Sequence, residues 1–382
     1  MIPRAVGSLV DRLLAGFPIV TITGPRQSGK TTLARAVFAG RPYRSLEDPD
    51  VRALAVDDPR GFLSGLRDGA VLDEVQRAPD LMSYLQSNVD DDGRMGRFVL
   101  TGSQQFGLMS GISQSLAGRS AFVELLPMSR AELAGDGRAP GSLNETLFMG
   151  GYPALYDRPV APRDWFPAYV AAYVERDVRQ LLKVQDLDSF QRFVRLCAGR
   201  SGQLLNLSSL AADCGITHNT ARAWISVLEA SYILFLLPPH HANFNKRLVK
   251  SPKLYFLDTG LLCWLLGIQE PDQLAAHPLR GAIFETWVVG ELRKAYLNRG
   301  ERPLFYFWRD SNGNEVDLLV ESASGLMPIE IKSGQTLNRD FFSGLKRWMA
   351  LAGGMAEKPT LIYGGDGVHE RQGVRVLGWG EV

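Results

Sequence analysis

The chain has few cysteines and lacks any long apolar run. Its 382 residues include three cysteines, Cys197, Cys214 and Cys263, which lie far apart and form no CxxC pair. This spacing argues against a disulfide framework and a cysteine-rich zinc site, and it suits a reducing compartment. Apolar runs such as residues 232–237 are short, whereas a membrane helix needs roughly 20 apolar residues. We therefore expect a soluble, cytoplasmic protein without a membrane partner.

The N-terminus lacks the features of a signal peptide. Residues 1–20, MIPRAVGSLVDRLLAGFPIV, carry charges between their apolar stretches and contain no cleavage-like site. A signal peptide would instead show a charged start, one uninterrupted apolar stretch and small residues at its cleavage site. The segment predicts a short amphipathic helix that runs into a strand.

Net charge is also nearly absent, which excludes a protein that is basic over its whole surface. The 42 Lys and Arg residues and the 41 Asp and Glu residues leave a formal charge of +1. The distribution is uneven, because residues 179–253 hold ten Lys or Arg and only four Asp or Glu. Contact between this one segment and a polyanion is therefore compatible with the near-zero total.

The rest of the composition is that of a globular protein, with 45% hydrophobic and 22% charged residues and no internal repeat. Its length predicts two or three domains, at roughly 100–200 residues per domain. Short apolar runs alternate with helical patterns through the first 130 residues, and these runs cover 17–23, 70–72, 97–100 and 121–126. Strands separated by helices predict an α/β fold with a parallel sheet.

A glycine-rich loop follows the first of these predicted strands. Residues 24–31, GPRQSGKT, match the pattern GxxxxGK[ST], and a helix-forming run begins at Thr32. The backbone N–H groups of such a loop surround phosphate oxygens at a helix N-terminus. We expect Lys30 to neutralise the β- and γ-phosphates of ATP and Thr31 to bind Mg²⁺. The predicted nucleotide-binding residues of this segment are Gly24, Pro25, Arg26, Gln27, Ser28, Gly29, Lys30, Thr31 and Thr32.

Two carboxylates end the second predicted strand, in the run VLDE at residues 71–74. The carboxyl ends of neighbouring parallel strands lie at the same edge of a sheet, so this pair is expected beside the glycine-rich loop. Asp73 is predicted to hold the Mg²⁺ ion of the nucleotide, and Glu74 to orient the attacking water.

The third predicted strand continues into Thr101 and Ser103. The succession of the glycine-rich loop, the VLDE run and LTGS at residues 100–103 resembles the core of an AAA+ ATPase. The resemblance implies a polar residue after this strand that senses the γ-phosphate, for which Ser103 is the preferred match and Thr101 the alternative. It also implies an arginine that stabilises the transferred charge, within one subunit or across two. Arg119 and Arg176 are the candidates, and a surface salt bridge is the alternative for each.

Residues 208–228 have the pattern of a helix, a glycine turn at Gly215 and a second helix. Ser208 and Thr217 are the expected N-caps. This is the pattern of a helix-turn-helix, and the β-rich segment 232–256 that follows would form the wing of a winged helix. A packing module without DNA contact is the alternative. The predicted nucleic-acid contacts are Arg222 in the second helix and, in the wing, Lys246, Arg247, Lys250 and Lys253.

Acidic residues on three C-terminal elements could meet in one site. Glu285 lies in a predicted helix at 281–289 and Asp317 in a predicted strand at 314–320. Glu330 and Lys332 share one face of a strand at 328–332. The carboxylates could hold Mg²⁺ or Mn²⁺, while the metal and Lys332 activate water. The arrangement resembles the PD-(D/E)xK nuclease fold of many restriction endonucleases. The alternative is an inactive interaction module with the same fold.

The order of motifs along the chain resembles one family, the bacterial and archaeal AAA+ ATPases with a C-terminal DUF4143 domain. The likeness covers about residues 12–351 and includes YVERD at 173–177, KSPKLYFLDTG at 250–260 and FWRD at 307–310. It implies an AAA+ P-loop core, a winged-helix middle domain and an α/β restriction-endonuclease-like C-terminal domain. The predicted divisions are an ATPase core at 1–150, a helical linker or lid at 151–185, the winged-helix-like domain at 186–268 and the nuclease-like domain at 269–382.

These features together predict an ATP-hydrolysing protein that acts on DNA. In this hypothesis the state of the nucleotide is coupled to the winged-helix and nuclease-like half of the chain. The alternative is a nucleotide-regulated switch, or a motor on branched DNA, whose nuclease-like domain binds without cleaving. A homo-oligomer is left open, because an arginine that acts across two subunits would require one.

Overall fold

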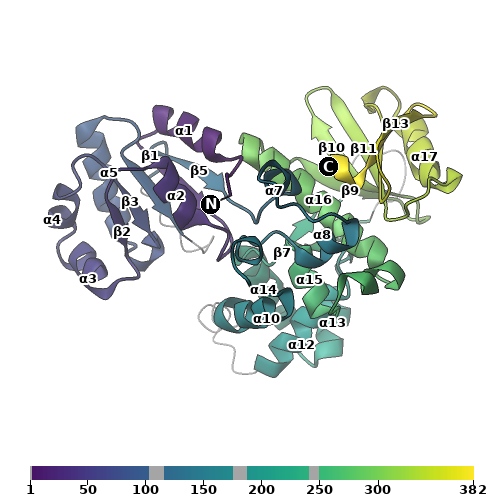
Figure 1. Cartoon of the computed structure of the whole chain (residues 1–382), viewed down its shortest axis with the longest axis horizontal. Helices are drawn as coiled ribbons and strands as arrows, with labels where there is room; N and C mark the ends of the chain where they lie inside the picture. The colour runs from purple at the N-terminus through teal and green to yellow at the C-terminus, as the bar shows by residue number, and fades with distance from the viewer. Residues whose placement is uncertain (1, 103–115, 175–186, 241–248) are drawn as a thin grey trace. The chain divides into compact units, whose positions relative to one another are not determined.

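The computed structural model describes residues 2–102, 116–174, 187–240 and 249–382 (Figure 1). These residues form two compact units. The first unit comprises Met1–Met128, Tyr152–Asp157 and Ala295–Glu301, and the second comprises Ser129–Gly151, Arg158–Lys294 and Arg302–Val382.

A sheet of five parallel strands forms the centre of the first unit, in the order β2-β3-β4-β1-β5. Strands β1, β3 and β4 are buried along their whole length, as expected for parallel strands that are covered on both faces. The predicted α/β core with a parallel sheet is confirmed. The strands are β1 (Ile19–Thr23), β2 (Tyr43–Ser45), β3 (Ala70–Asp73), β4 (Phe98–Thr101) and β5 (Ser120–Glu124).

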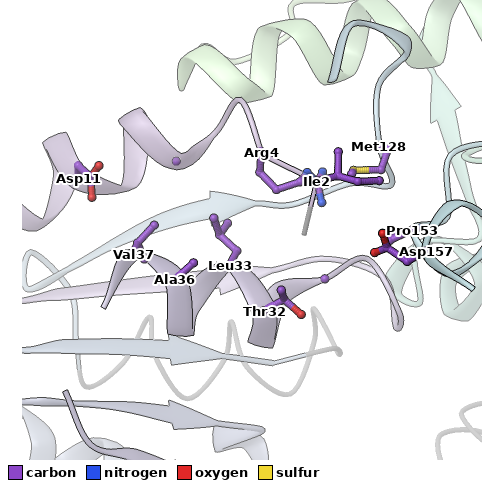
Figure 2. A pocket seen from close by; sticks show the side chains of 12 residues that line it. Ile2, Arg4, Asp11, Thr32, Leu33, Ala36, Val37, Met128, Pro153 and Asp157 are labelled. Atoms are coloured by element: carbon purple, nitrogen blue, oxygen red, sulfur yellow. The ribbon is translucent and has the colours of Figure 1, made fainter. Parts of the chain in front are cut away.

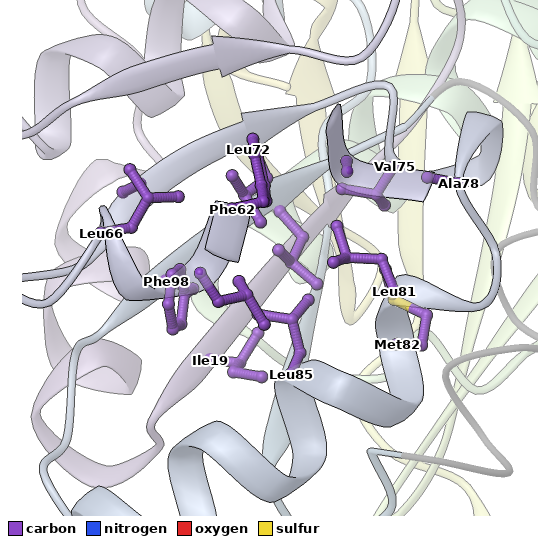
Figure 3. Close-up of a cluster of buried hydrophobic side chains, with 14 of the residues drawn as sticks. Ile19, Phe62, Leu66, Leu72, Val75, Ala78, Leu81, Met82, Leu85 and Phe98 are labelled. Carbon is purple, nitrogen blue, oxygen red and sulfur yellow. The ribbon is translucent and has the colours of Figure 1, made fainter. Parts of the chain in front are cut away.

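Two apolar clusters cover the two faces of this sheet. Successive strand residues point to opposite faces, and accordingly Val20 and Val99 belong to one cluster while Ile19 and Phe98 belong to the other. Helices α1 and α2 pack in the first cluster, and α3, α4 and α5 supply the second (Figure 3). The helices of this unit are α1 (Gly7–Gly16), α2 (Lys30–Val37), α3 (Pro49–Asp57), α4 (Pro59–Ser64), η1 (Val75–Arg77), α5 (Leu81–Asp92) and α9 (Ala154–Asp157).

The second unit contains three helices packed with a three-stranded antiparallel sheet of order β6-β8-β7. Gly215 ends α13 with a φ of 69°, and Thr217 caps α14 by accepting from the Thr220 N–H at 3.1 Å. The cap predicted at Ser208 is wrong, because α13 begins earlier and Asn206 caps it. These elements are α12 (Leu187–Ala198), β6 (Gln203–Leu204), α13 (Leu207–Cys214), α14 (His218–Ala230), β7 (Leu234–Leu237) and β8 (Lys253–Phe256).

The C-terminal part of the same unit is a mixed six-stranded sheet of order β13-β14-β12-β11-β10-β9. Strands β11, β12 and β14 pair in parallel, and the other pairs are antiparallel. Leu345 and Trp348 of α17 pack in the apolar clusters of this sheet. The elements are α16 (Arg280–Arg299), β9 (Phe305–Arg309), β10 (Glu315–Ser322), β11 (Gly325–Lys332), α17 (Ser343–Ala352), β12 (Thr360–Tyr363), β13 (Val368–Arg371) and β14 (Val374–Gly378).

Two described residues between β7 and β8, His240 and Val249, lie at the edge of this six-stranded sheet. The His240 N–H donates to the carbonyl of Phe307 at 2.7 Å, and the Val249 N–H donates to the carbonyl of Arg309 at 3.3 Å. Strand β9 therefore gains partners from a segment that the sequence assigned to a different domain. The remaining helices of the second unit are α7 (Arg130–Gly135), α8 (Leu143–Met149), α10 (Pro162–Tyr169), η2 (Val170–Val174), α15 (Thr259–Leu265), η3 (Pro271–Ala276), η4 (Arg339–Phe342), η5 (Gly353–Met355) and η6 (Trp379–Glu381).

The helices and the cysteines of the described residues bear on two expectations, because the sequence predicts neither a membrane span nor a disulfide framework. None of the helices within them combines the length and the apolar character needed to cross a lipid bilayer. The three cysteines are free thiols, and all three are buried.

Trp224 anchors α14 to α12 and faces away from solvent. Its ring makes edge-to-face contacts with Phe190 at 5.3 Å and Phe193 at 5.2 Å between centroids. Arg222, two residues earlier on the same helix, is exposed. The helix thus has a core face and a polar face, and Trp224 belongs to the core.

We expect Trp224→Ala to lower the free energy of unfolding by about 3–5 kcal/mol, because it leaves a cavity between α12 and α14. The control Arg222→Ala should change it by less than about 0.5 kcal/mol, since that side chain lies at the surface. Urea denaturation of the full chain, followed by circular dichroism, measures both. Equal effects of the two substitutions would contradict this packing.

Candidate functional site

The glycine-rich loop connects β1 to α2, and its backbone requires glycine at position 24. Gly24 has a φ of 145°, and a Cβ atom there would lie 2.1 Å from the carbonyl oxygen of Leu125. Gly29 caps α2 in a left-handed conformation, with a φ of 94°. Gln27 is also left-handed, with a φ of 63°. The loop is therefore held in a strained, tightly curved path at the N-terminus of α2, as a phosphate-binding loop requires.

Lys30 closes the loop on its inner side. Its ammonium group donates to the carbonyls of Gly24 at 3.1 Å and Pro25 at 2.7 Å, and the residue is 6% exposed. The hydroxyl of Ser28 is buried and has no hydrogen-bond partner within the described part of the chain. A buried hydroxyl without a partner is destabilising, so the Ser28 hydroxyl is a spare donor for an incoming anion. These positions fit the roles that the sequence predicts for the loop.

An arginine that the sequence did not single out supports the loop from outside. Arg4 donates through Nη1 to the carbonyl of Ser28 and through Nη2 to the carbonyl of Leu126, both at 2.7 Å. These contacts span 24 and 122 residues, and no local motif marks them. Arg4 therefore positions the phosphate loop against the chain that follows β5.

Asp73, at the carboxyl end of β3, is the acceptor for three hydroxyl groups. Its Oδ2 accepts from Thr31 at 2.9 Å and from Tyr43 at 2.6 Å, and its Oδ1 accepts from Thr101. The carboxylate is 6% exposed. Hydroxyl donors satisfy its oxygens without bringing a positive charge. Asp73 and Thr31 thus lie together as the predicted Mg²⁺ site requires, and the chemistry of both suits that ion.

Tyr43 is the residue of this group that sequence reasoning missed. It lies on β2, whose register places Ser45 opposite Asp73. Burial and the hydrogen bond to Asp73 raise the pKa of Tyr43 above its ordinary value, so its hydroxyl is a permanent donor. The guanidinium carbon of Arg35 lies 4.9 Å from the centre of the ring. The strand that carries Tyr43 has only three residues, YRS, and lacks the apolar pattern from which a strand is predicted.

The residues predicted to act on the attacking water and the γ-phosphate are Glu74 and Ser103, with Thr101 as the alternative to Ser103. Glu74 follows β3 in a left-handed conformation, with a φ of 55°, and its carboxylate accepts from the side chain of Gln76. Thr101, the alternative to Ser103, has its hydroxyl on Asp73. Ser103 itself lies outside the described residues. The roles of Glu74 and Ser103 in hydrolysis therefore stay predictions.

Arg119 does not face the phosphate loop of its own chain. It precedes β5, which runs parallel to β1, whereas the loop follows the carboxyl end of β1. It thus lies at the opposite edge of the sheet, where its guanidinium pairs with Asp90 at 2.5 Å. The prediction that Arg119 acts within one subunit is wrong for this reason, and action across two subunits stays a prediction. Arg176 lies outside the described residues.

A cavity of about 420 Å³ adjoins the loop within the first unit (Figure 2). Thr32, Leu33 and Ala36 of α2 form one wall, and Ile2 and Arg4 lie across from them. The volume falls in the range of small-molecule sites, roughly 300–1,000 Å³. Because Gly29 and Thr32 also line it, a molecule bound there lies beside the phosphate loop. The complete lining is Ile2, Arg4, Gly7, Asp11, Gly29, Thr32, Leu33, Ala36, Val37, Met128, Pro153 and Asp157.

The four predicted residues of the nuclease-like site do come together in the second unit. Lys332 contacts Glu330 Oε1 at 2.5 Å and Asp317 Oδ2 at 3.3 Å. Asp317 also accepts from the Ile331 N–H at 2.8 Å. Burial, followed by repulsion from Asp317, raises the pKa of Glu330 to about 8. Glu285 belongs to the same cluster, because burial and, to a smaller extent, repulsion from Asp317 raise its pKa.

Two residues from β8 complete this cluster, and one of them corrects a prediction. The Lys253 ammonium lies 2.9 Å from Glu285 Oε1 and pairs with Glu315 as well, and the Tyr255 hydroxyl donates to Glu285 at 2.5 Å. Lys253 is 3% exposed. It is therefore not available for the predicted contact with a nucleic-acid phosphate, because its charge is buried against these carboxylates.

The predicted second metal site is not formed in this conformation. Across residues 2–102, 116–174, 187–240 and 249–382, no group of three or more His, Cys, Asp or Glu is arranged to hold a metal ion. The reason is visible in the contacts, since Lys253 engages Glu285 while Lys332 engages Asp317 and Glu330. The ammonium groups take the carboxylate oxygens that a metal would need.

The remaining predicted nucleic-acid contacts fall into two groups. Arg222, on α14, and Lys250, just before β8, are exposed. Lys246 and Arg247 lie outside the described residues. Contact of this exposed pair with nucleic acid stays a prediction.

Three family profiles match successive parts of the chain. A profile described as an AAA domain matches residues 16–134, and one described as a domain of unknown function, DUF4143, matches residues 280–382. Between them, a further domain of unknown function, DUF8612, matches residues 141–272.

Relatives with similar sequences occur in mycobacteria. Proteins described as uncharacterised, from Mycobacterium bovis and Mycobacterium tuberculosis, are each 34% identical to the chain over 337 residues. The match covers 87% of this chain and 74% of each relative.

Solved structures that the chain is similar to include a Walker-type ATPase of Pyrococcus abyssi, with 15% identity and a TM-score of 0.47. This match covers 69% of this chain and 96% of that one. The Holliday junction branch migration motor RuvB of Thermotoga maritima has 18% identity and a TM-score of 0.31. That match covers 61% of this chain and 89% of the motor.

We expect Tyr43→Phe to weaken binding of magnesium-bound ATP by about tenfold, because a hydrogen bond to a charged group contributes roughly 1.5–3 kcal/mol. Binding of ATP in EDTA should change little, since Tyr43 contacts Asp73 and not the loop. Calorimetry with and without Mg²⁺ separates the two effects. Tyr84→Phe, at another half-buried tyrosine of this unit, is the control. A loss of affinity that is equal in EDTA would contradict a role through Asp73.

Proposed function

The chain belongs to the AAA ATPases that carry a C-terminal DUF4143 domain, and on that basis we propose that it is a Mg²⁺-dependent ATPase whose nucleotide state controls a DNA-binding second half. The observation that carries the first part is the contact between Thr31 and Asp73 beside a closed glycine-rich loop. This contact joins the hydroxyl and the carboxylate that a nucleotide-bound Mg²⁺ needs.

Each residue of the first unit has a defined task in this proposal. Lys30 exchanges its loop carbonyls for the β- and γ-phosphates, since an ammonium gains more from an anion than from neutral oxygens. Thr31 and Asp73 would hold Mg²⁺, which offsets charge on the phosphates when bound. Glu74 orients the attacking water, and the cavity beside Gly29 receives the nucleoside.

The proposal that the second half binds DNA is supported by the order of elements α12, β6, α13, α14, β7 and β8. This order, with a sheet of order β6-β8-β7, is that expected of a winged helix. Arg222 projects from the second helix of the helix-turn-helix, and Lys250 lies in the predicted wing, just before β8. Both are exposed cations in the basic stretch 179–253, where contact with phosphates would not depend on base sequence.

For the nuclease-like part, the contacts favour a domain that binds DNA without cleaving it. Glu285, Asp317, Glu330 and Lys332 converge, but ammonium groups neutralise the carboxylates. A metal-dependent phosphodiesterase needs hard oxygens free to bind its ion. Cleavage, the second candidate, is favoured by the convergence itself and requires another arrangement of the cluster.

We expect Lys30→Ala to abolish ATP binding measurable by calorimetry, because it removes the cation that faces the phosphates. The exposed Lys346→Ala, which removes an equal charge far along the chain, should leave the affinity unchanged. Circular dichroism checks that both variants are folded. Retention of wild-type ATP affinity by folded Lys30→Ala would refute the loop assignment.

We expect the double substitution of Arg222 and Lys250 by alanine to weaken binding of a random-sequence DNA duplex. Two lost phosphate contacts reduce the slope of log K against log salt by about 2, at roughly 0.9 per contact. Fluorescence anisotropy at several salt concentrations measures both quantities, and Lys346→Ala is again the matched control. An unchanged affinity and slope would place DNA binding elsewhere or exclude it.

A further inference from the structure

The carboxylate cluster of the second unit has its own internal cation. The acidic side chains that meet there come from α16 and from strands β10 and β11, and they are Glu285, Glu315, Asp317 and Glu330. Lys332 belongs to the same strand as Glu330, and Arg309 pairs with Glu315 at 3.2 Å from the neighbouring strand. Of these three cations, Lys253 comes from the three-stranded sheet, as the first residue of β8.

Lys253 lies at the position where the helix carboxylate and a strand carboxylate meet. Its ammonium contacts Glu285 at 2.9 Å and pairs with Glu315, and it lies 5.6 Å from the centre of the Phe307 ring. A buried ammonium is costly without anionic partners. Two carboxylates therefore hold the Lys253 ammonium in place.

Glu330 shows that the cluster still has an unused ligand atom. The residue is 7% exposed, and within the described part of the chain its Oε2 is buried without a hydrogen-bond partner. A Cβ atom added at Gly344 of α17 would lie 3.2 Å from this oxygen, so the helix packs closely around it. A buried carboxylate oxygen without a donor is stabilised by a cation.

We propose that Lys253 takes the place of a divalent metal in this cluster and keeps the metal out, so that the site becomes competent only when Lys253 withdraws. The inference rests on the proposed nuclease-like character of the C-terminal part. A metal bound by Glu285, Asp317 and Glu330 would compete with an ammonium that is already held by Glu285. Lys253 is thus an autoinhibitory cation.

The position of Lys253 also connects this device to the proposed DNA surface. Lys250 is exposed three residues before it, in a segment whose Val249 N–H is bonded to Arg309 of β9. A contact made at Lys250 acts on the same short segment that carries Lys253 into the cluster. DNA binding at the wing is therefore a means by which Lys253 could be drawn out.

The test uses the full chain after EDTA treatment, with Mn²⁺ alone as the probe in calorimetry. Lys253→Met, which keeps the length of the side chain but removes the charge, should bind one more Mn²⁺ ion than the wild type. The extra site should be lost in Lys253→Met/Asp317→Asn. Lys253→Arg, which retains a cation, should resemble the wild type. Since all forms share an intact phosphate loop, any Mn²⁺ bound there cancels in the comparison.

Two results would overturn the proposal. One is a folded Lys253→Met that gains no Mn²⁺ site, and the other is a wild type that already has a site removed by Asp317→Asn. If Lys253→Met lacks a cooperative thermal transition, Mn²⁺ should restore one, and failure to do so also counts against the proposal. Nicking of supercoiled DNA is measured separately. A gained Mn²⁺ site without nicking supports the role of Lys253 while it refutes cleavage.

Discussion

A carboxylate taken out of water is tolerated only if donors or cations replace its hydration, since the uncompensated penalty is several kcal/mol. Asp73 and the cluster around Glu285 meet this constraint in opposite ways. Asp73 is surrounded by hydroxyl groups of Thr31, Tyr43 and Thr101, which satisfy its oxygens and leave its negative charge intact. Glu285 is instead paired with the ammonium of Lys253, which cancels the charge.

This difference decides what each group of residues can do. In the proposed function, the negative charge of Asp73 beside the phosphate loop would attract the Mg²⁺ ion of the nucleotide, and the residues that would hold this ion already lie together. A cancelled charge does not attract a second metal, and so the cluster in the second unit acts as an ionic joint between β8, α16 and β10. Removing one partner of such a buried pair is more disruptive than never having built it.

Much of the first unit was predictable because its signals are local. The loop at 24–31, the strand that ends in Asp73 and the strand that ends in Thr101 each lie within a few residues of sequence, and parallel pairing brings their ends together by geometry. The glycines of the loop and the Thr217 cap of α14 are likewise short-range requirements. Arg4 and Tyr43 escaped prediction because their partners lie 24 and 30 residues or more away.

The sequence by itself determined the strands and helices that carry the motifs and the presence of the residues for two kinds of chemistry, because periodicity and motif spacing are properties of neighbouring residues. It also brought Glu285, Asp317, Glu330 and Lys332 to notice as one possible group. Only the tertiary structure decided that Lys253 enters that group instead of facing solvent, and that Arg119 lies at the far edge of its sheet. Both outcomes depend on strand order and on pairing between distant segments, and a buried charge selects its partner from whatever the fold places within reach.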